Sequence, residues 1–256
     1  MRDQGYSRTE KQAVRDRVWA RLEQAGAGRY PGTHGRIPNF EGADQAALRL
    51  AGEVEWRRAG RVEANADPPQ RPLRALALAE GRKLYVAQPR LRTLKPFLKL
   101  DPDQLVIPLR HAASIDGAQA AGTPVSAEEI PRVDVFVCGA VAVNPAGVVI
   151  GDGNGYCDLR AALSYEAGII DEYTVIVATV HESQVLDEDL PAEAHDIRVD
   201  IIATPERIIR ADARTDRSAR ARTPSGIEWS LLSEEQIRSM PAIAALRRRQ
   251  EGNGNT

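Results

Sequence analysis

The segment with the clearest chemical potential is a glycine loop, Gly151-Asp152-Gly153-Asn154-Gly155-Tyr156-Cys157-Asp158. A short apolar stretch precedes it and a helical pattern follows it. Helix N-termini present free N–H groups and a positive dipole end, and glycines let a phosphate approach the backbone. The loop is therefore a candidate phosphate site, although it has neither a Walker sequence nor the GxGxxG spacing of a dinucleotide fold. The alternative is a corner turn without a ligand.

Two aspartates in this loop bear on what it would hold. Asp152 opposes direct anion binding unless a divalent cation intervenes. Asp158 is a candidate Mg²⁺ ligand, because Mg²⁺ commonly takes one or two carboxylates together with substrate phosphates. The alternative for Asp158 is a carboxylate that complements the helix dipole.

Further candidates follow the buried stretch 174–180. Glu182 and Gln184 come after its carboxyl end, where α/β proteins bind ligands, so we expect them at a substrate site. The four histidines are scattered without a metal-ligand spacing, which argues against zinc. No Gly-x-Ser-x-Gly elbow is present, which argues against that class of hydrolase.

Alternating strand and helix patterns surround these residues. The patterns predict helices over 7–26, 43–59, 73–80 and 158–168, and strands over 61–64, 83–87, 134–143, 148–150, 174–180 and 200–203. This alternation indicates an α/β fold with an open, mostly parallel sheet and helices on both faces. We expect an α/β domain over 1–211, a linker over 212–226, and a short amphipathic C-terminal tail over 227–256 whose helix Pro241 interrupts.

Composition restricts the partners. The 256 residues carry a net charge of -2 and 43% are apolar, which argues for a sizeable core and against a nucleic-acid surface. The sequence contains no apolar run of the ~20 residues that a membrane span needs. Its two cysteines form no CxxC, which fits a reducing compartment, so we expect a cytoplasmic protein. The sequence leaves the oligomeric state open.

Three ordered blocks resemble one known family. Gly151-x-Gly153-x-Gly155-Tyr156-x-Asp158 is similar to the glycine-rich loop of the 5-formyltetrahydrofolate cyclo-ligases. The stretch 181–204, with His181-Glu182-Ser183-Gln184, Leu190-Pro191 and His195-Asp196, resembles the closing block of that family. Lys11-x-x-x-Arg15 is similar to its opening basic pair. The resemblance covers about residues 8–210.

The resemblance implies an enzyme that uses ATP and Mg²⁺ and acts on a reduced folate. ATP would phosphorylate the formyl oxygen of 5-formyltetrahydrofolate, and a ring nitrogen would then displace phosphate to give the 5,10-methenyl compound. By this analogy Lys11 and Arg15 contact phosphates, and Gly151, Gly153 and Gly155 line the cradle. Tyr156 closes over a ligand, Asp158 is the metal ligand, and both are candidate catalytic residues.

The chain also departs from that pattern. Asp152 and Asn154 stand where a basic residue is typical, and Cys157 replaces a tyrosine. The stretch 67–74 reads D-P-P-Q-R-P-L-R in place of the folate-side block, and we expect Gln70 within it to contact substrate. These changes indicate a paralogous branch. A second hypothesis is therefore a non-cyclising protein that binds a nucleotide or another heterocyclic phosphate, with a link to thiamine metabolism.

Overall fold

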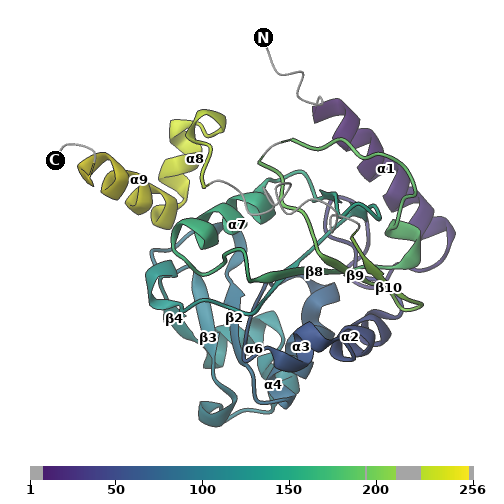
Figure 1. The fold of residues 1–256 in the computed structure, drawn as a ribbon, viewed down its shortest axis with the longest axis horizontal. Coiled ribbons are helices and arrows are strands. Elements are labelled where there is room, and N and C mark those ends of the chain that lie inside the picture. The colour runs from purple at the N-terminus through teal and green to yellow at the C-terminus, as the bar shows by residue number, and fades with distance from the viewer. Residues whose placement is uncertain (1–7, 194, 212–225, 254–256) are drawn as a thin grey trace.

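The computed structural model describes residues 8–193, 195–211 and 226–253. Its main sheet has eight strands in the order β10-β9-β8-β5-β1-β2-β3-β4 (Figure 1). These strands are β1 (Arg61–Ala64), β2 (Lys83–Ala87), β3 (Phe97–Leu100), β4 (Thr123–Val125), β5 (Val135–Cys138), β8 (Val175–Thr179), β9 (Ile201–Ala203) and β10 (Ile208–Arg210). The five from β9 to β2 run parallel, and β3, β4 and β10 add antiparallel edges. The predicted open, mostly parallel sheet is confirmed.

Helices cover both faces of this sheet. They are α1 (Arg8–Gln24), α2 (Ala43–Ala51), α3 (Val54–Arg58), α4 (Arg71–Ala79), α5 (Leu109–Ala112), α6 (Ile115–Ala121), α7 (Tyr156–Glu166), α8 (Glu234–Ser239) and α9 (Pro241–Asn253). In Figure 1, α7 lies above the sheet and α2, α3, α4 and α6 lie below it. None of the described helices is both long enough and apolar enough to cross a membrane.

The central strands explain why both faces can be covered. Along β1, Val62 and Ala64 point into the apolar cluster beneath the sheet, whereas Glu63 points to the opposite face. Neighbouring β5 alternates in the same way, with Val135 and Val137 in the lower cluster and Phe136 in the upper one. Strands buried on both faces are what a parallel sheet requires.

The structure corrects several expected boundaries. The expected strand over 134–143 ends at Cys138, and the chain leaves the sheet at Gly139. The backbone of Gly139 passes so close to Asn65 that a Cβ at this position would lie 2.5 Å from the Nδ2 atom of Asn65. Its remainder becomes β6 (Ala142–Val143), which pairs with β7 (Val149–Ile150) in a separate antiparallel ribbon. The expected helix over 43–59 is two helices, α2 and α3, separated at Gly52.

The small ribbon connects the N-terminal helix to the glycine loop. Val18 and Leu22 of α1 pack against Val141 and Ile150, which belong to the ribbon region. Because β7 leads directly into the glycine loop, this apolar contact fixes the distance between α1 and that loop. Lys11 and Arg15, which lie on the same helix, are thereby placed beside it.

A buried ion pair links the sheet to α7. Nη1 of Arg160 donates to Oε1 of Glu63 at 3.0 Å, and Nη2 donates to the carbonyl of Val137 at 2.9 Å. The hydroxyl of Ser164 donates to the other Glu63 oxygen at 3.3 Å. Glu63 is 0% and Arg160 3% exposed, and burial raises the pKa of Glu63 to about 7. The helix that follows the glycine loop is therefore attached to the sheet by charge as well as by apolar packing.

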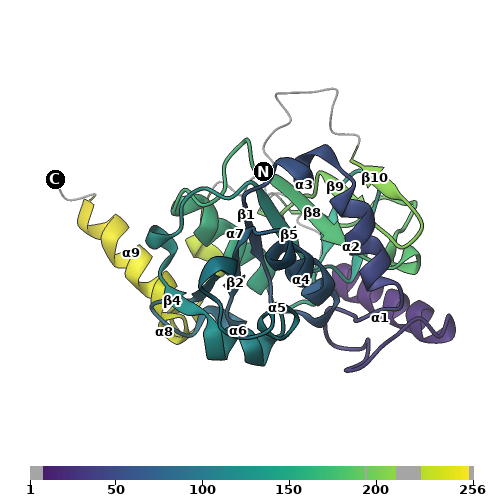
Figure 2. The ribbon, with the colours of Figure 1, turned by 90° about the horizontal axis from the view of Figure 1, so that it is seen from below.

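The C-terminal helices pack onto the same upper face. Met240, Ala242 and Ile243 belong to the apolar cluster that contains α7 and the upper side chains of the sheet. Figure 2 shows α9 and α1 at opposite ends of the molecule. The expected linker over 212–226 lies outside the described residues except for Gly226, so it stays a prediction.

The buried pair generates a stability prediction. Glu63→Ala leaves the guanidinium of Arg160 buried without its counter-charge, and we expect unfolding free energy to fall by about 3–5 kcal/mol. Glu188→Ala, which removes an exposed partner of Arg17, should cost less than about 1 kcal/mol. Urea unfolding at pH 8 measures both. Similar small losses in the two variants would show that the buried pair does not hold α7 in place.

Candidate functional site

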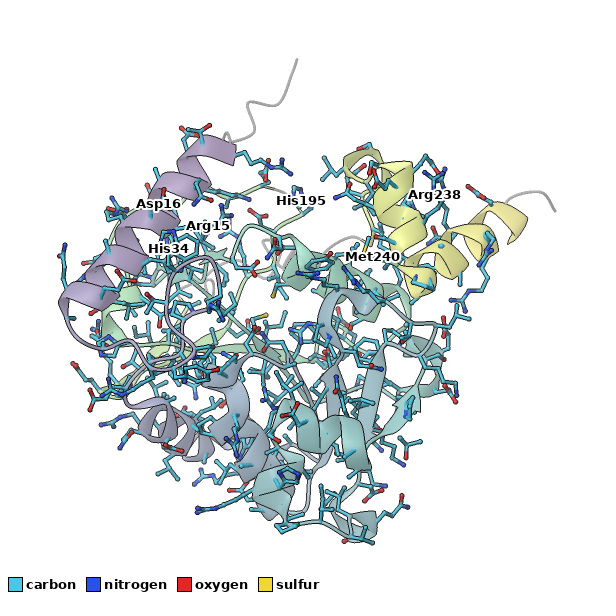
Figure 3. All side chains as sticks on the ribbon, turned by 180° about the vertical axis from the view of Figure 1, so that it is seen from behind. Arg15, Asp16, His34, His195, Arg238 and Met240 are labelled. Carbon is cyan, nitrogen blue, oxygen red and sulfur yellow. The ribbon has the colours of Figure 1, made fainter. Side chains whose placement is uncertain are left out.

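The glycine loop forms the floor of a pocket of about 410 Å³. One wall is the first half of α1, with Arg8, Lys11 and Arg15. A second wall is the segment around Glu193 and Asp196, and a third is formed by residues 226–240 of the C-terminal segment. In Figure 3, Arg15 lies on the α1 side, Met240 on the α8 side, and His195 between them. The volume is in the range of small-molecule sites.

The loop leaves the start of α7 open to this pocket. Gly155 is the N-cap residue, with φ of 70°, and no side chain caps the helix. Gly153 also has a positive φ, of 93°, a conformation that favours glycine. The first N–H groups of a helix lack intrahelical partners, so an uncapped N-terminus attracts an anion. The loop therefore has a backbone conformation that would suit a phosphate, and the cradle itself stays a prediction.

Arg15 lies against the inside of the loop. Its Nε donates to the carbonyl of Gly151 at 2.7 Å, and a Cβ on Gly153 would lie 3.1 Å from its guanidinium carbon. Arg15 is buried, with 7% exposure, yet lines the pocket. A guanidinium beside an uncapped helix start is suited to a phosphate oxygen.

Lys11 instead lies among carboxylates. Its Nζ is 2.8 Å from Oε2 of Glu193 and 2.5 Å from Oδ2 of Asp196. Burial lowers the pKa of Lys11, but the bonds to these two acids outweigh it and raise the pKa above its ordinary value. Lys11 therefore neutralises acid at one end of the pocket, and its contact with a phosphate would need one partner to be exchanged.

Asp158 lies beside the same acids. Its Oδ1 accepts the backbone N–H of Ile197 at 3.2 Å. Burial and the nearby charge of Asp196 raise the pKa of Asp158 to about 6, although Lys11 and His195 act in the opposite direction. Ligand atoms of Glu193, His195 and Asp196 also lie within 4.8 Å of one another. Carboxylate oxygens gathered this closely are the donors that a hard divalent cation takes.

Asp152 shapes the loop from within. Its carboxylate accepts the N–H of Asn154 at 3.0 Å and the side-chain amide of Asn154 at 2.8 Å, as in an Asx turn. The carboxylate also contributes to a charge excess. Among the ionic residues lining the pocket, three are basic and five acidic: Arg8, Lys11, Arg15, Asp152, Asp158, Glu193, Asp196 and Glu228. An anionic ligand would therefore need an accompanying cation.

The structure brings together most of the residues that the sequence identified, but not all. Lys11, Arg15, Gly151, Gly153, Gly155, Tyr156 and Asp158 all line the pocket. The three proposed substrate residues lie outside that lining. Glu182 forms an ion pair with Arg207, and Gln184 donates to the carbonyls of Ala140 and Val141.

Gln70 is buried below the carboxyl ends of the strands. Its Nε2 lies 3.5 Å from the hydroxyl of Thr179, and its Oε1 has no partner within the described part of the chain. The roles expected for Gln70, Glu182 and Gln184 stay predictions.

Sequence reasoning did not identify several pocket residues. Asp196 belongs to the His195-Asp196 pair of the family resemblance. Its proximity to Asp158, which lies 38 residues earlier in the chain, depends on tertiary structure and could not be read from the sequence. Glu193 and Arg8 have no local motif. The tail was expected from its amphipathic pattern, and that pattern alone does not reveal which surface the tail packs against.

The carboxylates generate a pH prediction. Because the pKa of Asp158 in the folded state lies above its ordinary value, the folded protein holds this proton more tightly than the unfolded chain. Stability should therefore fall as pH rises from about 4 to about 6 and then level off, by roughly 1–3 kcal/mol from this residue. Asp158→Asn should remove that part of the slope in melting temperature against pH. An unchanged slope would mean that Asp158 is not the group that titrates.

Comparison with known proteins gives consistent results. Residues 7–205 match the model of the 5-formyltetrahydrofolate cyclo-ligase family. A methenyltetrahydrofolate synthase domain-containing protein of Mus musculus is 38% identical over 248 residues, 95% of this chain and 65% of that protein. Its counterpart in Homo sapiens is 34% identical over 249 residues, 95% of this chain and 63% of that protein. The chain thus spans less than two thirds of these relatives.

A solved structure shares the fold. The 5,10-methenyltetrahydrofolate synthetase of Aquifex aeolicus superposes with a TM-score of 0.52 and 19% sequence identity. The superposition covers 80% of this chain and 95% of that protein.

Proposed function

The chain belongs to the 5-formyltetrahydrofolate cyclo-ligase family, and we propose that it is a ligase-type enzyme that binds ATP with Mg²⁺ in the pocket between α1 and the glycine loop and cyclises a formylated reduced folate. The observation that carries the proposal is the position of Arg15 and the uncapped start of α7 on the same pocket. Family membership supports the ligase chemistry, and the geometry supports a phosphate ligand.

The residues fit the two implied groups. Arg15 and the N–H groups at the start of α7 would hold phosphate oxygens. Asp158 and Asp196 would hold Mg²⁺, because the charge of Asp196 contributes to the raised pKa of Asp158 and a divalent cation would relieve that repulsion. Cation binding to Asp196 would also release Lys11 from one of its two acids, so that its ammonium group becomes available to a phosphate.

The chemistry then needs few protein groups. When bound, ATP supplies the phosphoryl group that turns the formyl oxygen of the folate, a poor leaving group, into a good one. Arg15 and Lys11 would orient the phosphates, and the pocket walls would exclude water from the activated carbon. Tyr156, the first residue of α7, would close over the ligand from the floor of the pocket.

A second candidate function rests on the loop itself. Asp152 contributes a carboxylate at a position where the family typically has a basic residue, and acidic residues outnumber basic residues in the lining of the pocket. Both facts favour a protein that binds a nucleotide or another heterocyclic phosphate without cyclising folate. Both functions need a pocket that binds phosphates and a heterocycle, and only the first needs a folate carbon placed to react. The two functions therefore differ in turnover and in the choice of ligand.

A direct assay tests the proposed reaction. Purified protein incubated with 5-formyltetrahydrofolate, ATP and Mg²⁺ should form the 5,10-methenyl product, seen as an increase in its ultraviolet absorbance. Asp158→Asn should lower the rate at least about tenfold, since it removes a metal ligand. If no product forms at high protein concentration while MgATP still raises the melting temperature, the cyclising reaction is wrong and the second function, binding without cyclisation, is supported.

The acidic loop generates a binding prediction. Asp152→Lys should strengthen MgATP binding by roughly threefold to tenfold, because a cation replaces an anion beside the phosphates. Asp152→Asn is the matched control: it keeps one of the two acceptor oxygens that serve the Asn154 turn, removes the charge, and should have an affinity between those of the wild type and Asp152→Lys. Calorimetric titration measures all three. Equal affinities would show that the phosphates do not lie at this loop.

A further inference from the structure

The C-terminal segment contributes a wall to the pocket although it lies outside the family domain. The family match ends at residue 205, whereas Ile227, Leu231, Leu232 and Met240 all line the pocket. These four side chains are apolar. The opposite wall, on α1, presents arginine and lysine. The C-terminal wall also carries three polar residues, Glu228, Gln236 and Ser239, so it is mainly rather than wholly apolar, whereas the wall on α1 is basic.

The apolar wall is held firmly against the domain. Met240 is 3% and Ile227 8% exposed, and both belong to the apolar cluster that includes α7. The carboxylate of Glu166, in the last turn of α7, accepts the N–H of Ile227 at 3.3 Å and the side chain of Gln250 at 3.0 Å. Gly226 has φ of 95°, and a Cβ there would lie 2.2 Å from Oε1 of Glu166. The segment thus reaches the pocket in one fixed register.

One exposed residue on this wall lacks a structural reason to be apolar. Leu231 is 55% exposed, at the end of the short helical turn Trp229–Leu231, and it faces the pocket. Tyr156 of the loop and Leu159 of α7 line the same pocket. Aliphatic and aromatic side chains that line one pocket beside a candidate phosphate cradle are suited to the apolar faces of a flat ring.

We propose that residues 226–240 form the base-binding half of the site: Leu231 and Met240 pack against the uncharged heterocycle of a nucleotide whose phosphates lie at Arg15 and the start of α7. This inference rests on the proposed function, because it needs the phosphates at the loop. It adds that ligand choice is set partly by a segment beyond the family domain. Leu231 is the specificity-determining residue, and Glu166 is a positioning residue for the wall.

Leu231→Asn is the variant that tests the wall. It removes the apolar contact without adding charge and keeps the number of side-chain heavy atoms, and because Leu231 is 55% exposed we expect the variant to fold as the wild type does. Leu48→Asn is its matched control, since Leu48 is 63% exposed on α2 and does not line the pocket. Circular dichroism and melting temperature verify that both variants fold like the wild type.

Two probes separate the ring from the phosphates. MgATP carries both, whereas magnesium tripolyphosphate carries only the phosphate chain. We expect wild type to bind MgATP more tightly than tripolyphosphate, and Leu231→Asn to weaken MgATP by roughly fivefold to tenfold, the size expected for one lost apolar contact. Its affinity for tripolyphosphate should be unchanged. Leu48→Asn should match wild type with both probes.

The outcomes distinguish the two proposals. If wild type binds MgATP and tripolyphosphate equally, or if Leu231→Asn binds MgATP as wild type does, the phosphate site stands and the base-binding wall is wrong. If wild type binds neither probe, the nucleotide site itself is wrong and the wall proposal is overturned with it. Glu166→Ala gives a further readout, because release of the wall should weaken MgATP while tripolyphosphate affinity is preserved.

Discussion

The site depends on how α7 is attached to the sheet. A glycine loop has little shape of its own, because its residues make few contacts that would fix it. Here the helix that follows it is attached to the central strand β1 by the buried pair of Glu63 and Arg160. The guanidinium of Arg160 also stacks on the ring of Phe136, with its carbon 4.2 Å from the ring centroid. The N–H groups at the helix start therefore have a defined direction, and the apolar packing of α1 on the β6–β7 ribbon places Arg15 opposite them.

The electrostatics of the pocket follow from this geometry. Burial alone would raise the pKa of Glu193, but the hydrogen bond and charge of Lys11 outweigh it, so the pKa of Glu193 lies below its ordinary value. Asp158 receives less compensation, which its raised pKa reflects. The ionic residues that line the pocket thus carry a net negative charge. A phosphate ligand that brings a divalent cation would offset this negative charge. The charge of the lining and the shape of the glycine loop therefore favour the same class of ligand.

The sequence predicted the elements with strong local signals and missed those defined by distant contacts. The buried strands β5 and β8 were expected from apolar runs, and the helix after the glycine loop was expected from the glycines before it. Strands β3, β4 and β10, which the sequence did not predict, are short and lie at the two ends of the sheet, so only their pairing defines them. In the same way Gly153 and Lys11 were found from motifs. The carboxylates around Lys11 and the apolar wall at Leu231 depend on the packing of segments that are far apart in sequence.

The wall around Leu231 has a consequence for biosynthesis. The ribosome synthesises the chain from its N-terminus, so α1, the glycine loop and the whole sheet are made before residues 226–240. The sheet, α1 and the glycine loop can therefore fold before the apolar side chains of residues 226–240 are available to them. Under the proposed function, a nucleotide base would gain its apolar contacts only once these residues have packed beside α7, so nucleotide affinity would arise later in synthesis than the fold of the sheet.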